Sequence, residues 1–222
     1  MRKIFLSFIL IILMCSMQIQ KPVKVIFFGD SITRAGVDPG GYITLMREAV
    51  KENINPGYEL IGAGIGGNKV YDLFLRFEED VLSKKPDVVV IYIGVNDVWH
   101  KQSSQTGTDP DKFIAFYTAM IKKLQASGIR VIVCTPAVIG ERTDFSNSQD
   151  GDLNRYSNII RELAKKYTCD LVDLRKAFLD FNLKNNLENK ESGILTSDRV
   201  HLNATGNKLV ADLMLNVLSG KK

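Results

Sequence analysis

The sequence predicts an α/β fold in which helices cover both faces of a parallel β-sheet. Short apolar runs alternate along the chain with helix-length amphipathic segments, which is the pattern that parallel strands and crossover helices produce. The composition, with 45% hydrophobic and 24% charged residues, is that of an ordinary globular domain. A chain of 222 residues is also long enough to bury a substantial core.

Five runs rich in β-branched and aromatic residues are expected to form the sheet. In chain order they span residues 23–29, 58–63, 87–94, 129–135 and 169–174. Apolar residues at helical spacing predict helices over 41–53, 68–84, 110–127, 152–167 and 203–218. No internal repeat or change of composition marks a second domain, so we expect a single domain over residues 21–222.

The first 20 residues have the layout of a secretory signal peptide. Arg2 and Lys3 precede an apolar run over residues 4–14, and the chain then turns polar. The run is shorter than the roughly 20 apolar residues that a spanning helix needs. We therefore expect export, to a periplasm or to the outside of the cell.

A retained N-terminal anchor is the alternative to export of a processed protein. Cys15 directly follows the apolar run and raises a lipid anchor as one form of it. Lipoprotein signals usually have a small residue before the cysteine, whereas Met14 stands there in this chain. The sequence therefore favours a removed signal peptide over a lipid-anchored protein.

Charge and cysteine content exclude some classes of partner. The formal net charge is +4, and the basic residues are scattered among acidic ones, so we expect no nucleic-acid partner. Cys134 and Cys169 should lie near opposite ends of neighbouring strands, too far apart to form a disulfide. We expect both to be small buried side chains and not a disulfide or metal pair.

Ser31 follows the first predicted strand, in Gly29-Asp30-Ser31. Ligands of parallel sheets bind beyond the carboxyl ends of the strands, so a hydroxyl there is well placed for chemistry. A serine becomes a nucleophile when a neighbouring base takes its proton. The structural alternative is that Ser31 caps the following helix, and only the presence of a base decides between the two.

The chain has only two histidines, His100 and His201, as candidate bases. Asp198 lies three residues before His201, a spacing that lets the carboxylate fold back and orient the imidazole. The alternative is that Asp198 caps a turn and His201 lies on the surface.

Asn96 and Asp97 stand just past the third predicted strand. A side-chain amide at this edge can donate to a developing oxyanion, and loss of such a donor typically costs about 10²–10³ in rate. Asn-Asp is also ordinary turn chemistry, and we assign no role to Asp97.

Four blocks of the sequence together resemble the SGNH (GDSL-type) ester hydrolase family. They are "FFGDSIT" at 27–33, "GAGIGGN" at 62–68, "IGVNDVW" at 93–99 and "SDRVHLN" at 197–203. The blocks occur in family order, and the resemblance covers nearly the whole chain from about Val23 to Leu218. Many relatives have an asparagine where this chain has Gly62, which is the one departure from the pattern.

The resemblance implies a mechanism in which Ser31 attacks an ester carbonyl and His201 acts as general base and then as general acid. Asp198 would orient His201. The oxyanion hole would consist of the backbone N–H groups of Ser31 and Gly67 and the side-chain amide of Asn96. The implied fold is a flavodoxin-like three-layer α/β/α sandwich with a parallel five-stranded sheet, and no metal or organic cofactor is implied.

The glycines at 62, 64 and 67 also satisfy G-x-G-x-x-G, a dinucleotide-binding pattern. That fingerprint belongs to the first strand-to-helix turn, with a carboxylate ending the next strand. Here the glycines follow the second strand, and the next strand ends in Gly94-Val95-Asn96. They more plausibly let the backbone turn so that the Gly67 N–H faces the reacting carbonyl.

Substrate choice is expected to depend on two loops, 98–109 and 136–151, because they leave the third and fourth strands beside the site. Both loops are mostly polar, whereas a deep acyl pocket would need more apolar lining. They favour short acyl groups, such as acetyl esters of a polar alcohol like a carbohydrate. Lysophospholipid or thioester cleavage is the alternative, followed by an inactive relative that binds a glycan or ester, or a flavodoxin-like cofactor carrier. Trp99, His100 and Phe145 are candidate substrate contacts, although such side chains also serve plain packing.

Overall fold

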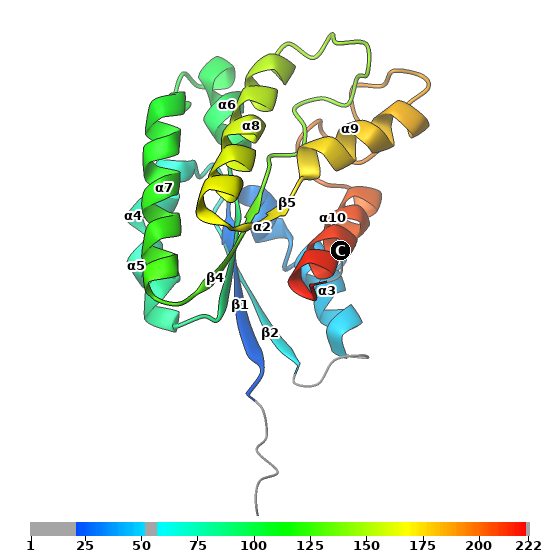
Figure 1. Ribbon diagram of the computed structural model, residues 1–222. Helices are drawn as coiled ribbons and strands as arrows, with labels where there is room; N and C mark the ends of the chain where they lie inside the picture. Colours follow the sequence, from blue (N-terminus) through cyan, green and yellow to red (C-terminus); the bar gives the residue numbers. More distant parts are fainter. Residues whose placement is uncertain (1–20, 52–56, 221–222) are drawn as a thin grey trace, which may run out of the picture.

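Five parallel strands form a single sheet in the computed structural model, which describes residues 21–51 and 57–220 (Figure 1). The strands are β1 (Val23–Gly29), β2 (Tyr58–Gly64), β3 (Val88–Tyr92), β4 (Arg130–Cys134) and β5 (Asp170–Val172). Their order in the sheet is β2-β1-β3-β4-β5. This arrangement confirms the expected α/β fold, whereas the expected signal peptide at 1–20 lies outside the described residues.

Helices cover both faces of the sheet, giving three layers (Figure 1). On one face α3 (Tyr42–Lys51) packs against α10 (Ala204–Leu218). The other face carries α4 (Val70–Leu75), α5 (Phe77–Asp80), α7 (Pro110–Ala126) and α8 (Asp150–Tyr167). The remaining elements are α2 (Ser31–Ala35), the 3₁₀-helix η1 (Leu82–Lys84), α6 (Val95–Ser103) and α9 (Leu174–Asn185). None of the helices among the described residues is long and apolar enough to cross a membrane.

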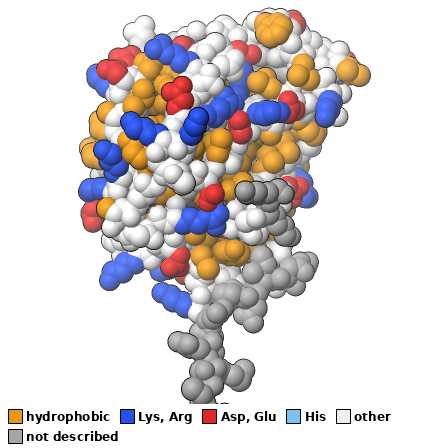
Figure 2. All heavy atoms as spheres, viewed as in Figure 1, with side chains coloured by type: hydrophobic (Ala, Val, Ile, Leu, Met, Phe, Trp, Pro, Cys, Tyr) orange, Lys and Arg blue, Asp and Glu red, His pale blue; other side chains and the backbone are white. Residues whose placement is uncertain are grey.

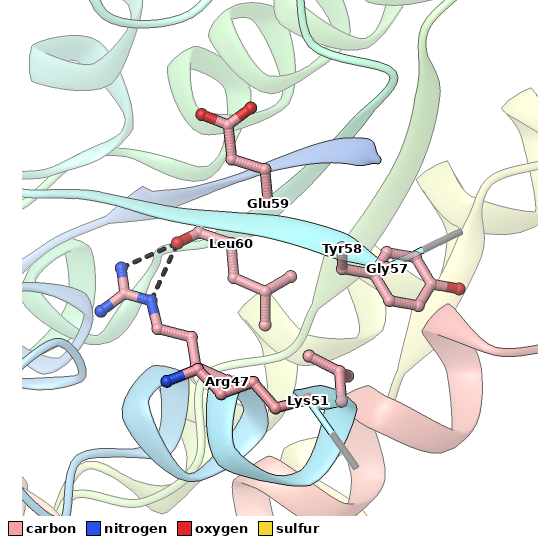
Figure 3. A pocket seen from close by; sticks show the side chains of 7 residues that line it. Arg47, Lys51, Gly57, Tyr58, Glu59 and Leu60 are labelled. Atoms are coloured by element: carbon pink, nitrogen blue, oxygen red, sulfur yellow. Dashed lines mark hydrogen bonds between the residues drawn. The ribbon is translucent and has the colours of Figure 1, made fainter. Parts of the chain in front are cut away.

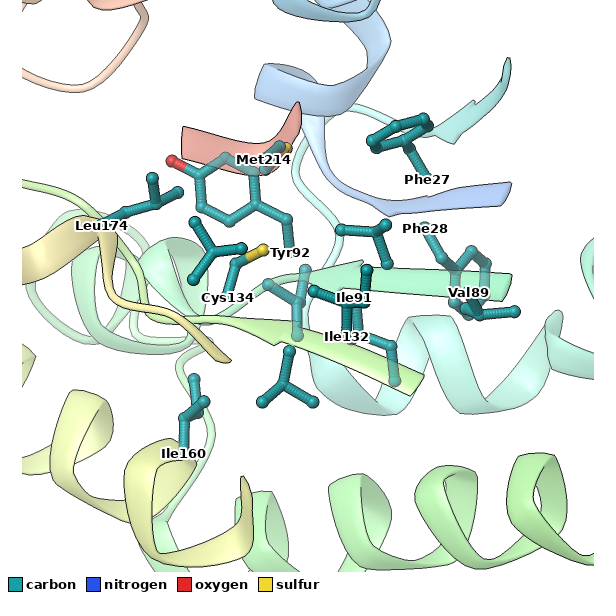
Figure 4. Close-up of a cluster of buried hydrophobic side chains, with 14 of the residues drawn as sticks. Phe27, Phe28, Val89, Ile91, Tyr92, Ile132, Cys134, Ile160, Leu174 and Met214 are labelled. Atoms are coloured by element: carbon teal, nitrogen blue, oxygen red, sulfur yellow. The ribbon is translucent and has the colours of Figure 1, made fainter. Parts of the chain in front are cut away.

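The central strands are buried on both faces. Every residue of β3 is buried, and residues 25–28 of β1 are completely so. Figure 4 shows side chains of β1, β3 and β4 beside Ile160, Leu174 and Met214, which come from the helices. A strand covered by helices on both sides must be apolar at successive positions, which explains continuous runs such as "VVVIY".

Three helical segments differ from the sequence prediction. The helix expected over 68–84 is divided into α4, α5 and η1, with Arg76 at the first break. The first half of the segment 98–109 belongs to helix α6 and is not a loop. The sequence predicts no helix where α9 lies. Both helices are rich in polar side chains, so their apolar spacing is weak, and tertiary contacts decide their conformation.

The ends of the three strands nearest Ser31 are level with one another. Gly29, the last residue of β1, pairs with Gly64 of β2 on one side and with Tyr92 of β3 on the other. Because the strands are parallel, the segments that leave them emerge at the same edge of the sheet. The order reverses at β1, which is where ligands of such sheets bind.

Gly64 lies where β2 meets helix α2. A Cβ at this position would come within 2.2 Å of the Arg34 backbone nitrogen and 2.6 Å of the Asp30 carbonyl oxygen. Both neighbours are main-chain atoms of rigid elements, so they cannot turn aside as a side chain could. We expect Gly64→Ala to lower the free energy of unfolding by about 1–3 kcal/mol, measured by chemical denaturation.

Gly151 supplies the matched control for this substitution. It lies in the first turn of α8, and a Cβ there would meet no atom within 4 Å. Gly151→Ala should leave stability unchanged or raise it by up to about 1 kcal/mol. Equal stability of the two variants would contradict the close approach of α2 to β2.

Candidate active site

Ser31, His201 and Asp198 form one continuous chain of hydrogen bonds. The Ser31 Oγ lies 2.9 Å from His201 Nε2, and His201 Nδ1 lies 2.7 Å from Asp198 Oδ2. With Nδ1 protonated, the imidazole donates to Asp198 and leaves Nε2 to accept the Ser31 hydroxyl. This arrangement can move a proton from Ser31 to His201 while Asp198 holds the ring in place.

Ser31 is presented by the first turn of α2, directly after β1. Asp30 precedes it and caps the helix, because its Oδ1 accepts the Ile32 backbone N–H at 2.9 Å. The Asp30 side chain is almost completely buried. Burial raises the pKa of Asp30 to about 7, an effect that the Ile32 hydrogen bond opposes.

His201 and Asp198 belong to a loop that precedes α10. The second carboxylate oxygen of Asp198 accepts the backbone N–H groups of Val200 at 3.1 Å and His201 at 2.8 Å. Partial burial raises the pKa of Asp198, but the hydrogen bonds from His201 and Val200 outweigh it and hold the pKa below its ordinary value. Asp198 therefore remains a carboxylate that can support a positive charge on His201.

Asn96 and Gly67 lie at the ends of the strands that flank β1. Asn96 is in the first turn of α6, and its Nδ2 donates one hydrogen to the Asn68 carbonyl at 3.1 Å. A primary amide carries a second hydrogen, which can serve a ligand. Gly67 has φ +78°, a left-handed conformation that favours glycine and reverses the chain directly before Asn68.

Asp97, to which the sequence assigned no role, ties the start of α4, which follows the glycine segment, to α6. It is completely buried and accepts the Val70 backbone N–H through both oxygens, at 3.1 and 3.3 Å. Burial raises the pKa of Asp97 to about 6 despite its hydrogen bonds. Only its position next to Asn96 hinted at this role, because its partner lies 27 residues away.

Arg76 is a second supporting residue that sequence reasoning missed. Its Nη2 donates to the Gly29 carbonyl at 2.8 Å and to the Ala63 carbonyl at 3.1 Å. Gly29 is the last residue of β1, and Ala63 is the last but one of β2. The Arg76 Nε donates to Asn68 Oδ1 at 2.8 Å. These contacts pull Arg76 toward the sheet, which accounts for the break between α4 and α5. One guanidinium thus joins the residue before Asp30-Ser31 to the residue after Gly67.

The glycines of "GAGIGGN" are explained by packing and turning. Gly64 is required by the close approach of α2, and a Cβ on Gly62 would meet the Val37 side chain at 2.4 Å. Gly67 forms the turn. These constraints account for the spacing without a bound dinucleotide.

Of the three candidate substrate contacts, Trp99 lies beside His201, His100 lies beside Gly67, and Phe145 is exposed to solvent. The Trp99 ring meets the His201 ring edge to face, with centroids 6.4 Å apart. The His100 ring approaches Gly67, with Cε1 4.0 Å from the position of a Cβ there, and partial burial followed by the positive charge of Lys69 lowers its pKa. Phe145 is 96% exposed on the loop after β4.

Other features of the surface stand apart from this site. Figure 2 shows basic and acidic side chains interspersed on one face of the molecule. Within the ranges that the structure describes, no group of three or more His, Cys, Asp or Glu side chains could hold a metal ion. A hollow of about 410 Å³ lies between α3 and the start of β2, where Arg47 donates to the Leu60 carbonyl (Figure 3). It is at the amino end of β2, whereas Ser31 and Asn96 follow carboxyl ends.

Comparison with known proteins gives one consistent relationship. The sequence model of the GDSL-like lipase/acylhydrolase family matches residues 27–209. An acetylxylan esterase of Geobacillus stearothermophilus is 30% identical over 221 residues, covering 90% of this chain and 95% of that protein. The isoamyl acetate-hydrolyzing esterase 1 homolog of Rattus norvegicus is 25% identical, covering 84% of this chain and 78% of that protein.

Solved structures agree with the sequence matches. The crystal structure of the acetyl xylan esterase AlAXEase superposes with a TM-score of 0.86 at 67% sequence identity. The alignment covers 87% of this chain and 98% of that one. At this identity the similarity extends beyond the fold to most of the sequence.

The raised pKa values of Asp30 and Asp97 predict an unusual dependence of stability on pH. From about pH 4 up to about pH 7 for Asp30, and up to about pH 6 for Asp97, the folded protein retains a proton that the unfolded chain has released. Stability from these groups should therefore fall as pH rises through these ranges, by at most about 1.4 kcal/mol per pH unit for each. Denaturant titrations at several pH values measure the slope.

Asp30→Asn tests the assignment, because the amide oxygen can still accept the Ile32 N–H but the side chain no longer titrates. We expect a shallower pH slope in this variant. Asp38→Asn, at an exposed position, is the control and should keep the wild-type slope. Identical slopes in all three proteins would show that Asp30 carries no raised pKa.

Proposed function

The chain belongs to the GDSL-like lipase/acylhydrolase family and is a carboxylic ester hydrolase, and from this premise we propose that it is a serine esterase that removes acetyl groups from carbohydrates. The observation that carries the proposal is the hydrogen-bonded chain from Ser31 through His201 to Asp198. The acetylxylan esterases among its relatives support an acetylated xylan or its oligosaccharides as substrate.

In the first half of the reaction, Ser31 Oγ attacks the carbonyl carbon of the acetyl group. His201 Nε2, at 2.9 Å, takes the hydroxyl proton as the new C–O bond forms. Negative charge then collects on the former carbonyl oxygen. We assign its stabilisation to the backbone N–H groups of Ser31 and Gly67 and to the second Nδ2 hydrogen of Asn96.

In the second half, the intermediate expels the sugar alkoxide, and His201 returns the proton to that oxygen. The product is an acetyl ester on Ser31. A water molecule gives its proton to His201 and attacks this ester, and acetate leaves while Ser31 recovers its hydrogen. Asp198 stabilises the imidazolium in both halves through the 2.7 Å hydrogen bond.

The surroundings of Ser31 favour a small acyl group and a polar alcohol. Trp99 packs edge to face on His201, and His100 lies over Gly67, so bulky rings stand close to the reacting atoms. We assign these two side chains to contact with the substrate. Phe145, an exposed ring on the loop after β4, would contact a sugar farther along an oligosaccharide.

The proposed location is outside the cytoplasm. The pattern of residues 1–20 supports a removed signal peptide, with residues 21–222 as the mature catalytic domain. A lipid anchor on Cys15 is the less favoured form of the same proposal.

A series of p-nitrophenyl esters from acetate to long acyl chains tests the function with residues 21–222 and their Ser31→Ala variant. We expect activity that falls with chain length and drops by about 10⁴-fold or more in the variant. Release of acetate from acetylated xylo-oligosaccharides then tests the alcohol. Rising activity with chain length would instead favour a lysophospholipase- or thioesterase-like enzyme, and inert wild type would favour an inactive binding relative.

Asn96→Ala tests the oxyanion assignment separately from the nucleophile. Removing a donor that acts mainly in the transition state should lower kcat by about 10²–10³ while KM stays within a few-fold. Asn158→Ala, on the exposed side of α8, is the matched control and should keep the wild-type kcat. A normal kcat in Asn96→Ala would remove the side chain from the oxyanion hole.

A further inference from the structure

Glu141 is a buried carboxylate in the loop that follows β4. Its side chain is only 1% exposed. All three hydrogen bonds that it accepts come from backbone N–H groups: Ile194 at 2.9 Å, Leu195 at 2.6 Å and Thr196 at 2.9 Å. Burying a carboxylate costs free energy unless hydrogen bonds compensate it. The three N–H donors therefore account for the presence of Glu141 in the interior.

The three N–H groups belong to the segment that leads directly to Asp198 and His201. This segment folds back on itself, because Thr196 pairs with Leu202 and the Ser197 N–H donates to the His201 carbonyl at 2.8 Å. The backbone on which His201 sits is therefore bonded to the same short stretch that Glu141 holds.

The loop after β4 makes two further backbone hydrogen bonds to the segment that carries Asp198 and His201. The Gly140 N–H donates to the Arg199 carbonyl at 2.9 Å, between Asp198 and His201 in the chain. The Glu141 N–H donates to the Glu191 carbonyl at 2.9 Å. Residues 140 and 141 thus connect the end of β4 to the His201 loop, which is otherwise far from Ser31 in sequence.

We propose that Glu141 is a positioning residue that sets the distance between His201 and Ser31. His201 does not follow a strand of the sheet, so its placement against Ser31 requires a link between its loop and the sheet. The Glu141 carboxylate supplies that link by fixing three successive peptide groups. This inference rests on the proposed function, since it concerns the residues assigned there to proton transfer.

Glu141→Gln is the variant that tests the inference. Glutamine keeps the size of the side chain, but its NH₂ group cannot accept an N–H, so at least one of the three hydrogen bonds is lost. A displacement of His201 by a fraction of an ångström to one ångström should lower kcat for p-nitrophenyl acetate by about 10–100-fold, with KM within about twofold. The low-field proton resonance of the His201 Nδ1–H should shift or broaden in the variant.

Leu124→Ala controls for a general loss of stability. Leu124 is fully buried on α7 beside the start of β4, whereas the loop with Glu141 follows the end of that strand, so its truncation destabilises the protein without touching the Glu141 cluster. At a temperature where both variants are folded, Leu124→Ala should keep the wild-type kcat and the low-field resonance. A wild-type kcat and resonance in Glu141→Gln would overturn the inference and leave Glu141 as a folding element only.

Hydrogen exchange on the wild-type protein covers the case in which Glu141→Gln does not fold. The amides of Ile194, Leu195 and Thr196 should exchange at rates comparable to those of the central strands. Exchange as fast as in exposed loops would contradict a fixed link. Failure of the proposed function is recognised separately, because it would leave wild type and Ser31→Ala equally inactive whatever Glu141→Gln does.

Discussion

The position of β1 between β2 and β3 is the constraint on which the rest of the site depends. Parallel pairing with Gly29 level with Gly64 and Tyr92 makes the following segments leave the sheet side by side. Ser31 follows the middle strand, while Gly67 and Asn96 follow its two neighbours. The proposed nucleophile and the two proposed donors are therefore brought together by the backbone pairing of the strands, independently of any side-chain contact within the site.

Two ionisable side chains, the partly buried Arg76 and the buried Asp97, then hold the segments that leave the strands. Arg76 joins the ends of β1 and β2 to Asn68, and Asp97 holds the Val70 N–H. Asn96 itself donates to the Asn68 carbonyl, so Asn68, directly after Gly67, is held through both its side chain and its backbone. Burying a charge is costly, and the raised pKa of Asp97 reflects that cost. The cost is offset by hydrogen bonds to backbone groups that would otherwise be free to move.

The proposed nucleophile and oxyanion donors follow strands of the sheet, whereas the proposed acid-base pair comes from a loop. His201 and Asp198 are supplied by the segment before α10, which reaches Ser31 across 170 residues of sequence. The sequence predicted different roles and conformations for two of the segments that leave the sheet. It assigned the loop after β4 to substrate choice alone, but the Gly140 and Glu141 part of that loop contacts the His201 segment. It also treated 98–109 as one irregular segment, although Trp99 and His100 lie on α6.

By itself the sequence determined the α/β class and all five strands to within two residues at each end, and it predicted the residues to which we assign the chemistry. These features depend on local patterns: apolar runs, helical spacing, and reactive side chains next to strand ends. Only the tertiary structure decided the strand order, the break at Arg76, helix α9 and the supporting contacts of Asp97, Arg76 and Glu141. The partners of these three side chains lie tens of residues away, and no local pattern in a single sequence encodes such a distance.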